Sequence, residues 1–334
     1  MNSKISTQVY YSLIALWAIA EAFVGGVIHD AKLPVSGLII GSCAVACLCL
    51  IGNYYNTKFS IIRATIIVCI FKFILSPQSP PTAYFAVMFQ GLLAQLFFYN
   101  NKWFLLKCVL FSVLCLVESA CQRIIILTIL NGQNFWLAIN IFIQKITHHA
   151  AVTNYSYVLI IFYIILHVLA GLAIGFYVGL LPPKITAFVP MKLKVDLETK
   201  KVLPINSKEK KKNKYGKLLW FSFFLVLLLA IQHYFIAEKS LENIIIKIFI
   251  RVLFLMLIWM VLLKPLAESI LRKWLQNQQS KYAIVVAEIN NLLPIIMGFI
   301  KQSWQESGNK KYLKRIDYFC ISLMSKIINE NKWS

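Results

Sequence analysis

The sequence predicts an all-α polytopic membrane protein: a six-helix bundle, then two further transmembrane helices and cytoplasmic amphipathic helices. Hydrophobic residues make up 59% of the 334 residues and charged residues only 14%, which is too apolar a composition for a soluble domain of this length. Several apolar runs reach the ~20 residues that a helix needs to cross the hydrocarbon core of a bilayer. The first run lacks a small-residue cleavage site after it, so we interpret it as a transmembrane helix and not as a signal peptide.

Six apolar runs in the first part of the chain predict the helices of the bundle. They cover residues 10–28, 34–52, 59–76, 82–99, 103–131 and 155–181. The fifth run is long enough for a tilted or protruding helix. Residues 132–154 are too interrupted by polar side chains to cross the bilayer. We therefore predict a short interfacial helix there, with Trp136 and Phe142 at the level of the lipid headgroups.

Lysine and arginine residues gather between and after the apolar runs, as they do on the cytoplasmic side of membrane proteins. The bias is consistent with a cytoplasmic N-terminus. It is decisive after the sixth run, where residues 190–217 carry ten lysines against three acidic residues. We interpret the net charge of +21 as a topological signal, with binding to anionic lipid headgroups as an added possibility and no nucleic-acid partner.

This layout predicts four segments along the chain. They are a six-span module at 1–185, a basic cytoplasmic linker at 186–216, a two-span membrane module at 217–264 and a cytoplasmic amphipathic helical tail at 265–334. The two later spans are the apolar runs near 217–236 and 243–263. In the tail, apolar residues recur at helical spacing, and Pro294 is expected to break or start a helix.

Polar side chains in and beside the apolar runs are the candidate substrate-binding residues, because polar groups are costly in lipid and usually face a protein interior or a cavity. They are Glu21, His29, Asp30, Lys72, Gln78, Gln90, Glu118, Gln122, Arg123 and His167. One interpretation is a pocket open to the outside and capped by the loops at 29–33 and 76–81. Three prolines, at 77, 80 and 81, forbid a continuous helix through the second loop.

The other interpretation of the same residues is a set of internal ion pairs that hold the bundle together. One such pair is Glu118 with Arg123. Another is Glu21 with His167, and Lys72 would then extend along the helix to the interface. The two interpretations differ in what they predict for substitutions, since only the pocket requires the side chains for ligand binding.

No motif in the sequence indicates an enzyme or a metal site. GxxxxGK[ST], HExxH, GxSxG and the paired aspartates of membrane phosphotransferases are all absent from it. The eight cysteines form no CxxC pair and no Cys/His ligand spacing, so we expect buried free thiols that pack as small hydrophobes. We predict neither a cofactor nor a bound metal.

Small residues recur every four positions in two of the apolar runs, and such stripes let helices approach closely. They are Ala18, Ala22 and Gly26 in the first run and Gly171, Gly175 and Gly179 in the sixth. The stripes fit packing within this chain. The stripe of the first run also fits contact with a partner subunit or with the second module.

The first 185 residues resemble the substrate-binding (S) component of an energy-coupling factor (ECF) vitamin transporter. The likeness rests on six spans with both ends inside, and on the stretches "AIAEAFVGG", "LPVSGLIIGS" and "SPPTAYFAVMFQGLLAQLFF". The resemblance implies a vitamin or similar micronutrient captured from outside. It also implies that a small-residue stripe, which Ala18 and Ala22 fit, meets the membrane-embedded coupling (T) component.

The second part of the chain is similar to such a T component, whose cytoplasmic coupling helices dock on two ATPase subunits. The stretch "LLPIIMGFIKQSWQESGNKK" has the expected proline, amphipathic helix and terminal glycine. The family's Ala-Arg-Gly-like triplet reads Glu306-Ser307-Gly308 here, without the arginine. The resemblance makes Trp304 and Gly308 candidate coupling residues, together with Ala18, Ala22 and Gly26.

These observations favour a non-enzymatic transport protein, in which an S-like module is fused to a coupling module and imports a small micronutrient with separate ATPases. It would lie in a bacterial cytoplasmic (inner) membrane with both termini in the cytoplasm. One alternative is a membrane-embedded enzyme acting on a lipid or isoprenoid, with Glu118 and His167 as acid and base. The other is a non-catalytic scaffold whose basic tail recruits partners or anionic lipid.

Overall fold

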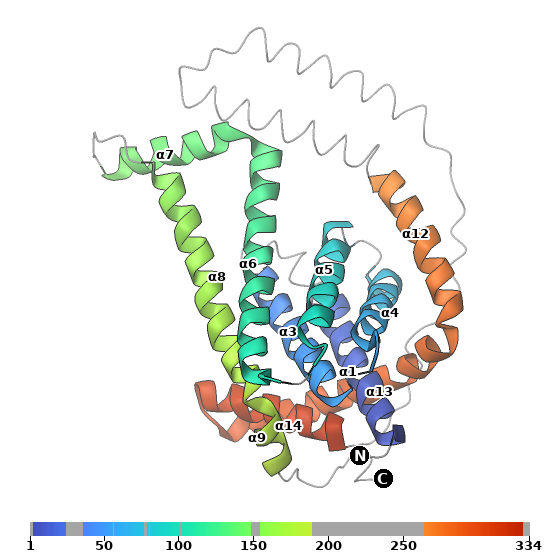
Figure 1. The fold of residues 1–334 in the computed structure, drawn as a ribbon. Coiled ribbons are helices and arrows are strands. Elements are labelled where there is room, and N and C mark those ends of the chain that lie inside the picture. Colours follow the sequence, from blue (N-terminus) through green and yellow to red (C-terminus); the bar gives the residue numbers. More distant parts are fainter. Residues whose placement is uncertain are drawn as a thin grey trace. The chain divides into compact units, whose positions relative to one another are not determined.

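The computed structural model describes residues 3–24, 36–55, 57–76, 79, 81–100, 102–147, 154–188 and 264–329 (Figure 1). Of these residues 92% are helical and none is in a strand, which confirms the predicted all-α class. Four helical stretches are long and apolar enough to cross a membrane. They are Gly37–Tyr54, Phe104–Asn131, Tyr155–Ala187 and Ala283–Asn309. The predicted spans at 217–236 and 243–263 lie outside the described residues.

The chain divides into two compact units, and each is described by itself. The first consists of Met1–Leu116, Val168–Ile205 and Lys273–Ser334, and the second of Val117–His167 and Asn206–Arg272. The C-terminal helices therefore belong to the same unit as the first helices of the chain. This division differs from the four segments expected from composition and charge, which stay a prediction.

The first unit is built around its N-terminal helix. Its helices are α1 (Ser3–Ile19), α3 (Ser36–Tyr54), α4 (Ser60–Leu75), α5 (Pro81–Phe97), α9 (Leu181–Ala187), α13 (Ala283–Glu306) and α14 (Tyr312–Asn329), with the first part of α6 (Phe104–Asn131), the last part of α8 (Tyr155–Gly179) and the second half of α12 (Lys264–Lys281). Helix α1 contacts α3, α4, α13 and α14. Leu13, Ile14 and Trp17 are fully buried, as expected for a helix that is apolar on all sides.

Several helix ends follow from local sequence. Helix α5 begins at Pro81, whose fixed φ suits the first position of a helix and whose missing N–H costs nothing there. Helix α6 ends at Asn131 and is followed by Gly132 with φ 71°, a conformation that glycine adopts without strain. Both ends lie where the polar and apolar pattern places them.

Helix α13 corrects one expectation, because it continues without interruption through Pro294. The side chains of Ile289, Leu293, Ile296 and Phe299 recur at helical spacing and are buried. Their packing offsets the backbone hydrogen bond that a proline removes. The stretch Ala283–Asn309 also has the length and hydropathy of a membrane span, whereas the sequence analysis assigns it to the cytoplasm.

The second unit contains the short helix expected between the fifth and sixth apolar runs. Helix α7 (Gln133–Thr147) leads from the end of α6 to the start of α8, and none of its residues is buried (Figure 1). Trp136 Nε1 donates a hydrogen bond to Thr128 Oγ1 at 3.1 Å. The backbone N–H of Ser156 donates to Asn140 Oδ1 at 2.7 Å. These bonds fix α7 to both neighbouring helices, and Phe142 stays 59% exposed.

The glycine stripe of α8 packs against α6 within the first unit. A Cβ added at Gly175 would lie 2.5 Å from the Cα of Val109, and one added at Gly171 would lie 2.7 Å from the Cα of Val113. No real Cβ tolerates such contacts, so these glycines allow the two backbones to approach closely. The stripe of the sixth run thus serves packing inside this chain.

Candidate functional site

A buried ion pair joins the ends of α1 and α4. Lys72 Nζ lies 2.6 Å from Glu21 Oε2, and the two side chains are only 3% and 4% exposed. Glu21 belongs to the π-helical segment Ala20–Val24 that continues α1, and Lys72 lies in the last turn of α4. Burying charges is costly, and the cost is tolerable only where each charge meets a partner. The structure therefore brings together two of the predicted site residues.

The π-helical turn at Glu21 is itself a local signal. π-Helical turns are rare, and they occur frequently at functional sites. The partner of Glu21 is Lys72, and not His167 as one of the sequence-based interpretations has it. Lys72 does not extend toward water either, since the residue is 2% exposed. A change in helical period cannot be read from residue spacing, so the sequence did not predict this pairing.

Small thiols surround the ion pair. Cys43 and Cys47 of α3 and Cys69 of α4 lie close enough to Glu21 to interact with its charge. All eight cysteines of the chain are free, as predicted. Among the described residues, no group of three or more His, Cys, Asp or Glu side chains could hold a metal ion. The surroundings of the pair are therefore compact and weakly polar.

Gln90 is a third predicted residue of the first unit that is buried. It lies on α5 and is 5% exposed, and its Oε1 atom has no hydrogen-bond partner. A Cβ added at Gly41 of α3 would lie 3.9 Å from Gln90 Nε2. Buried amide oxygens are normally hydrogen-bonded, and one without a partner calls for an explanation such as a ligand or a water.

The second unit contains four further predicted residues. Glu118 is half-buried and its Oε2 has no partner, while Arg123 is exposed, so the ion pair considered between them is not formed. Gln122 is half-buried. His167 is 1% exposed and its Nδ1 lies 2.9 Å from the carbonyl oxygen of Tyr163, whose ring packs on the imidazole at 4.3 Å. The carbonyl oxygen can only accept, so Nδ1 carries the proton and Nε2 is the orphaned atom.

Four predicted residues lie outside the described part of the chain: Gly26, His29, Asp30 and Gln78. Of the remaining coupling candidates, Ala18 is fully buried and Ala22 is 5% exposed, so both pack inside the chain. Trp304 is 50% exposed. Gly308 lies in the short 3-10 turn Ser307–Asn309 and is exposed, with open space where a Cβ would be.

A second buried ion pair, which the sequence analysis missed, ties α13 to α14. Lys326 is fully buried, and its Nζ lies 2.7 Å from Glu306 Oε2 and 3.3 Å from Ser303 Oγ. Ser322 Oγ donates to the same carboxylate at 2.8 Å. The six consecutive residues Ser322–Ile327 are all buried, where α14 contacts α1, α9 and α13. A lysine within the apolar stretch "SLMSKII" is the signal that could have revealed this cluster.

Replacing Lys326 by methionine is expected to lower the free energy of unfolding by about 1–3 kcal/mol, the usual penalty for leaving a buried polar group without its partner. Methionine fills the aliphatic volume, and Glu306 keeps its bond from Ser322 and its 13% exposure, which limit the loss. Denaturant titration of the purified protein measures the change. Lys301→Met on the exposed side of α13 is the control, and an equal loss there would refute the assignment.

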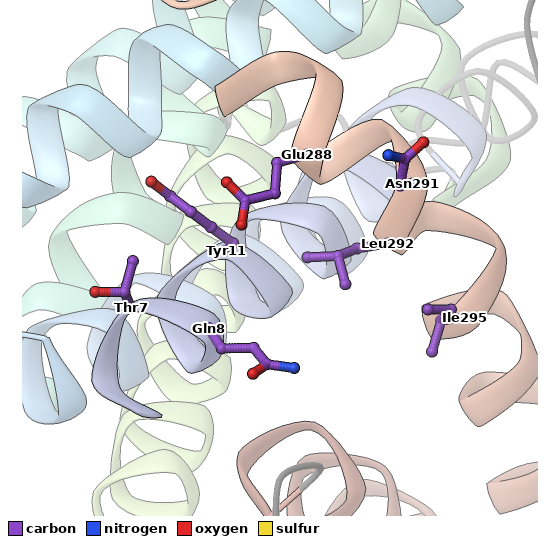
Figure 2. Close-up of a pocket in the computed structure, with 7 residues that line it drawn as sticks. All are labelled: Thr7, Gln8, Tyr11, Glu288, Asn291, Leu292 and Ile295. Carbon is purple, nitrogen blue, oxygen red and sulfur yellow. The ribbon is translucent and has the colours of Figure 1, made fainter. Parts of the chain in front are cut away.

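An open cleft of about 650 Å³ lies between α1 and α13. Its lining residues are Thr7, Gln8, Tyr11, Glu288, Asn291, Leu292 and Ile295. Figure 2 shows the Glu288 carboxylate directed toward Tyr11 across the cleft. Helical spacing places Tyr11 on the same face of α1 as Ala18, so the face with the small-residue stripe is the one that α13 approaches.

Comparison of the chain with family models, with curated proteins and with solved structures finds no match.

Proposed function

We propose that the chain is an integral membrane transport protein of the energy-coupling factor type, which binds a vitamin-like micronutrient and imports it with separate ATPase subunits. The observation that carries the proposal is the buried Glu21–Lys72 ion pair at the π-helical end of α1. The membrane is a bacterial cytoplasmic membrane, with both termini on the cytoplasmic side. The proposed activity needs no cofactor of its own.

The ion pair supports solute binding because ionisable groups inside apolar helices are expensive and usually mark a pathway for a substrate or an ion. Glu21 and Lys72 offer a carboxylate and an ammonium group within one small region, and each can exchange its partner for a charged or carbonyl group of a ligand. The unpartnered Oε1 of Gln90 offers a further acceptor in the same unit. This combination favours a polar solute over an apolar lipid.

The packing of α1 supports the coupling part of the proposal. Helix α1 carries Glu21 at its far end, and along its length it contacts α13 and α14. A displacement of these two C-terminal helices would therefore act on the helix that positions the ion pair. In the proposed mechanism, separate ATPases act on α13 and α14, where Trp304 and Gly308 are accessible.

The test is purification of the intact chain from its native membrane in mild detergent. Co-purifying proteins are identified, and bound small molecules are extracted for mass spectrometry. We expect two ATPase subunits and one stoichiometric small compound. The same is done with the double variant Glu21→Gln/Lys72→Gln, which removes both charges and leaves neither unpaired. It is expected to lose the compound and to retain the ATPases.

Lys102→Gln, at an exposed loop lysine, is the matched control and should retain both the compound and the ATPases. A wild-type protein that is isolated alone and empty would refute the transport proposal and favour a scaffold. A double variant that retains the compound would place the binding site elsewhere in the chain.

A further inference from the structure

The end of α13 and the first turns of α14 form an exposed surface that shares Trp304 with the proposed coupling site. We call it the basic corner, and it consists of Trp304, Lys311, Tyr312, Leu313, Lys314 and Arg315. Tyr312 is 88% exposed, Leu313 is 81% exposed and Trp304 is 50% exposed. Large apolar side chains that are exposed together mark an interaction site, whereas single ones are ordinary.

No acidic residue in the described part of the chain pairs with Lys311 or Lys314 of the basic corner. Residues 304–318 contain four basic and two acidic side chains. Both acids have lysine partners from outside this segment, because Glu306 pairs with Lys326 at 2.7 Å and Asp317 pairs with Lys184 at 3.1 Å. The exposed basic groups are thus left without acids of their own. Electrostatic complementarity then calls for an anionic partner.

Aromatic contacts hold the basic corner in place. The Arg315 guanidinium lies over the Trp304 ring, 4.3 Å from the ring centroid. The Phe319 ring packs edge-on against the same Trp304 ring, with 5.6 Å between the two centroids. A cation over an aromatic face is attracted by the ring's electron density. These contacts hold Trp304 and Arg315, at one edge of the corner, in place.

One helical stretch of membrane-spanning length ends at the basic corner, and a second ends beside Tyr318, three residues after it. The stretch Ala283–Asn309 ends just before Lys311. The stretch Tyr155–Ala187 ends where the Phe188 ring packs edge-on against Tyr318, at 5.5 Å between centroids. The end of a spanning helix lies at the level of the lipid headgroups, where tryptophan, tyrosine and basic residues are enriched. The tryptophan, tyrosine and lysine side chains of the corner fit that level.

We propose that the basic corner binds the headgroups of anionic lipids at the surface of this membrane. Lys311 and Lys314 contact the headgroup phosphates, and Tyr312 and Leu313 enter the boundary between headgroups and acyl chains. The pairing of exposed apolar side chains with uncompensated basic ones fits a bilayer surface, which presents anionic and apolar layers side by side. This inference does not rest on the transport proposal, although it shares Trp304 with the coupling site proposed there.

The test measures lipid binding to the full-length protein in detergent by native mass spectrometry, with phosphatidylglycerol as the anionic probe and phosphatidylcholine as the zwitterionic one. Each basic residue near an anionic surface strengthens binding by roughly fivefold. The variant Lys311→Gln/Lys314→Gln is therefore expected to bind phosphatidylglycerol at least about tenfold more weakly, with unchanged binding of phosphatidylcholine. Both lysines are exposed, so the fold should be unaffected.

A second variant, Tyr312→Ser/Leu313→Ser, tests the apolar part and should weaken the binding of both lipids by about tenfold. The matched controls are Lys273→Gln/Lys281→Gln on α12 and Ile284→Ser on α13, which are equally exposed and should bind both lipids as the wild type does. An unchanged phosphatidylglycerol affinity in either corner variant would overturn the proposal. It would indicate that the corner is covered by a protein surface. An equal loss in the controls would overturn it as well.

Discussion

Replacing Lys72 by methionine is expected to destabilise the protein by about 3–5 kcal/mol, because it leaves the Glu21 carboxylate buried without its partner. The side chains are 3% and 4% exposed, so water cannot take the place of the lysine. Denaturant titration of the purified protein in detergent measures the free energy of unfolding. Glu21→Leu alone should cost a similar amount, since it leaves the Lys72 ammonium group buried and unpaired.

The double variant Glu21→Leu/Lys72→Met separates this explanation from a loss of packing. It contains no buried charge, and replacing a complete buried ion pair by apolar side chains is often nearly neutral. We therefore expect it to recover most of the stability that either single variant loses. Lys102→Met at an exposed position is the control and should stay within about 0.5 kcal/mol of the wild type. Additive losses in the double variant would contradict a direct interaction between the two side chains.

The all-helical class was predictable because it depends on run length and composition. The helices α3, α6 and α8 coincide closely with long apolar runs, and turn residues such as Pro81 and Gly132 mark where helices start and end. Pro294 was misjudged because a proline in isolation disfavours a helix, whereas the buried face of α13 favours it. Tertiary packing is not visible in a local pattern.

The candidate site was predictable only in part, for the same reason. The cost of polar groups in apolar helices singled out Glu21 and Lys72 as residues that need a partner. Which residue is the partner depends on the rotation of each helix, and the π-helical turn at Glu21 changes that rotation. Lys326 was missed because a lysine in an amphipathic helix normally faces water. Here α1, α9 and α13 surround that part of α14.

The two buried ion pairs have different consequences for function. Lys326–Glu306 lies among serine hydroxyls that add hydrogen bonds to both charged groups, from Ser322 to the carboxylate and from Lys326 to Ser303. Glu21–Lys72 has neighbouring thiols, which are weak hydrogen-bonding groups. A ligand with stronger hydrogen-bonding groups can improve on these surroundings only at Glu21–Lys72. This contrast is the physical reason for proposing the solute site at Glu21 and a structural connection at Lys326.

Replacing Gly175 by leucine is the other change with a large expected effect, about 3 kcal/mol or more of lost stability. Even a methyl group at this position would lie 2.5 Å from Val109 Cα and 2.7 Å from the carbonyl oxygen of Cys108. Both are backbone atoms, so no side-chain rotation relieves the clash, and α8 must move away from α6. Thermal unfolding in detergent measures the loss.

Ala173→Leu is the matched control, since it adds a larger side chain two residues away on the exposed side of the same helix. It should leave the stability unchanged within about 0.5 kcal/mol. Equal stability of Gly175→Leu and Ala173→Leu would contradict the close packing of α8 on α6, in which a Cβ added at Gly175 lies 2.5 Å from Val109 Cα.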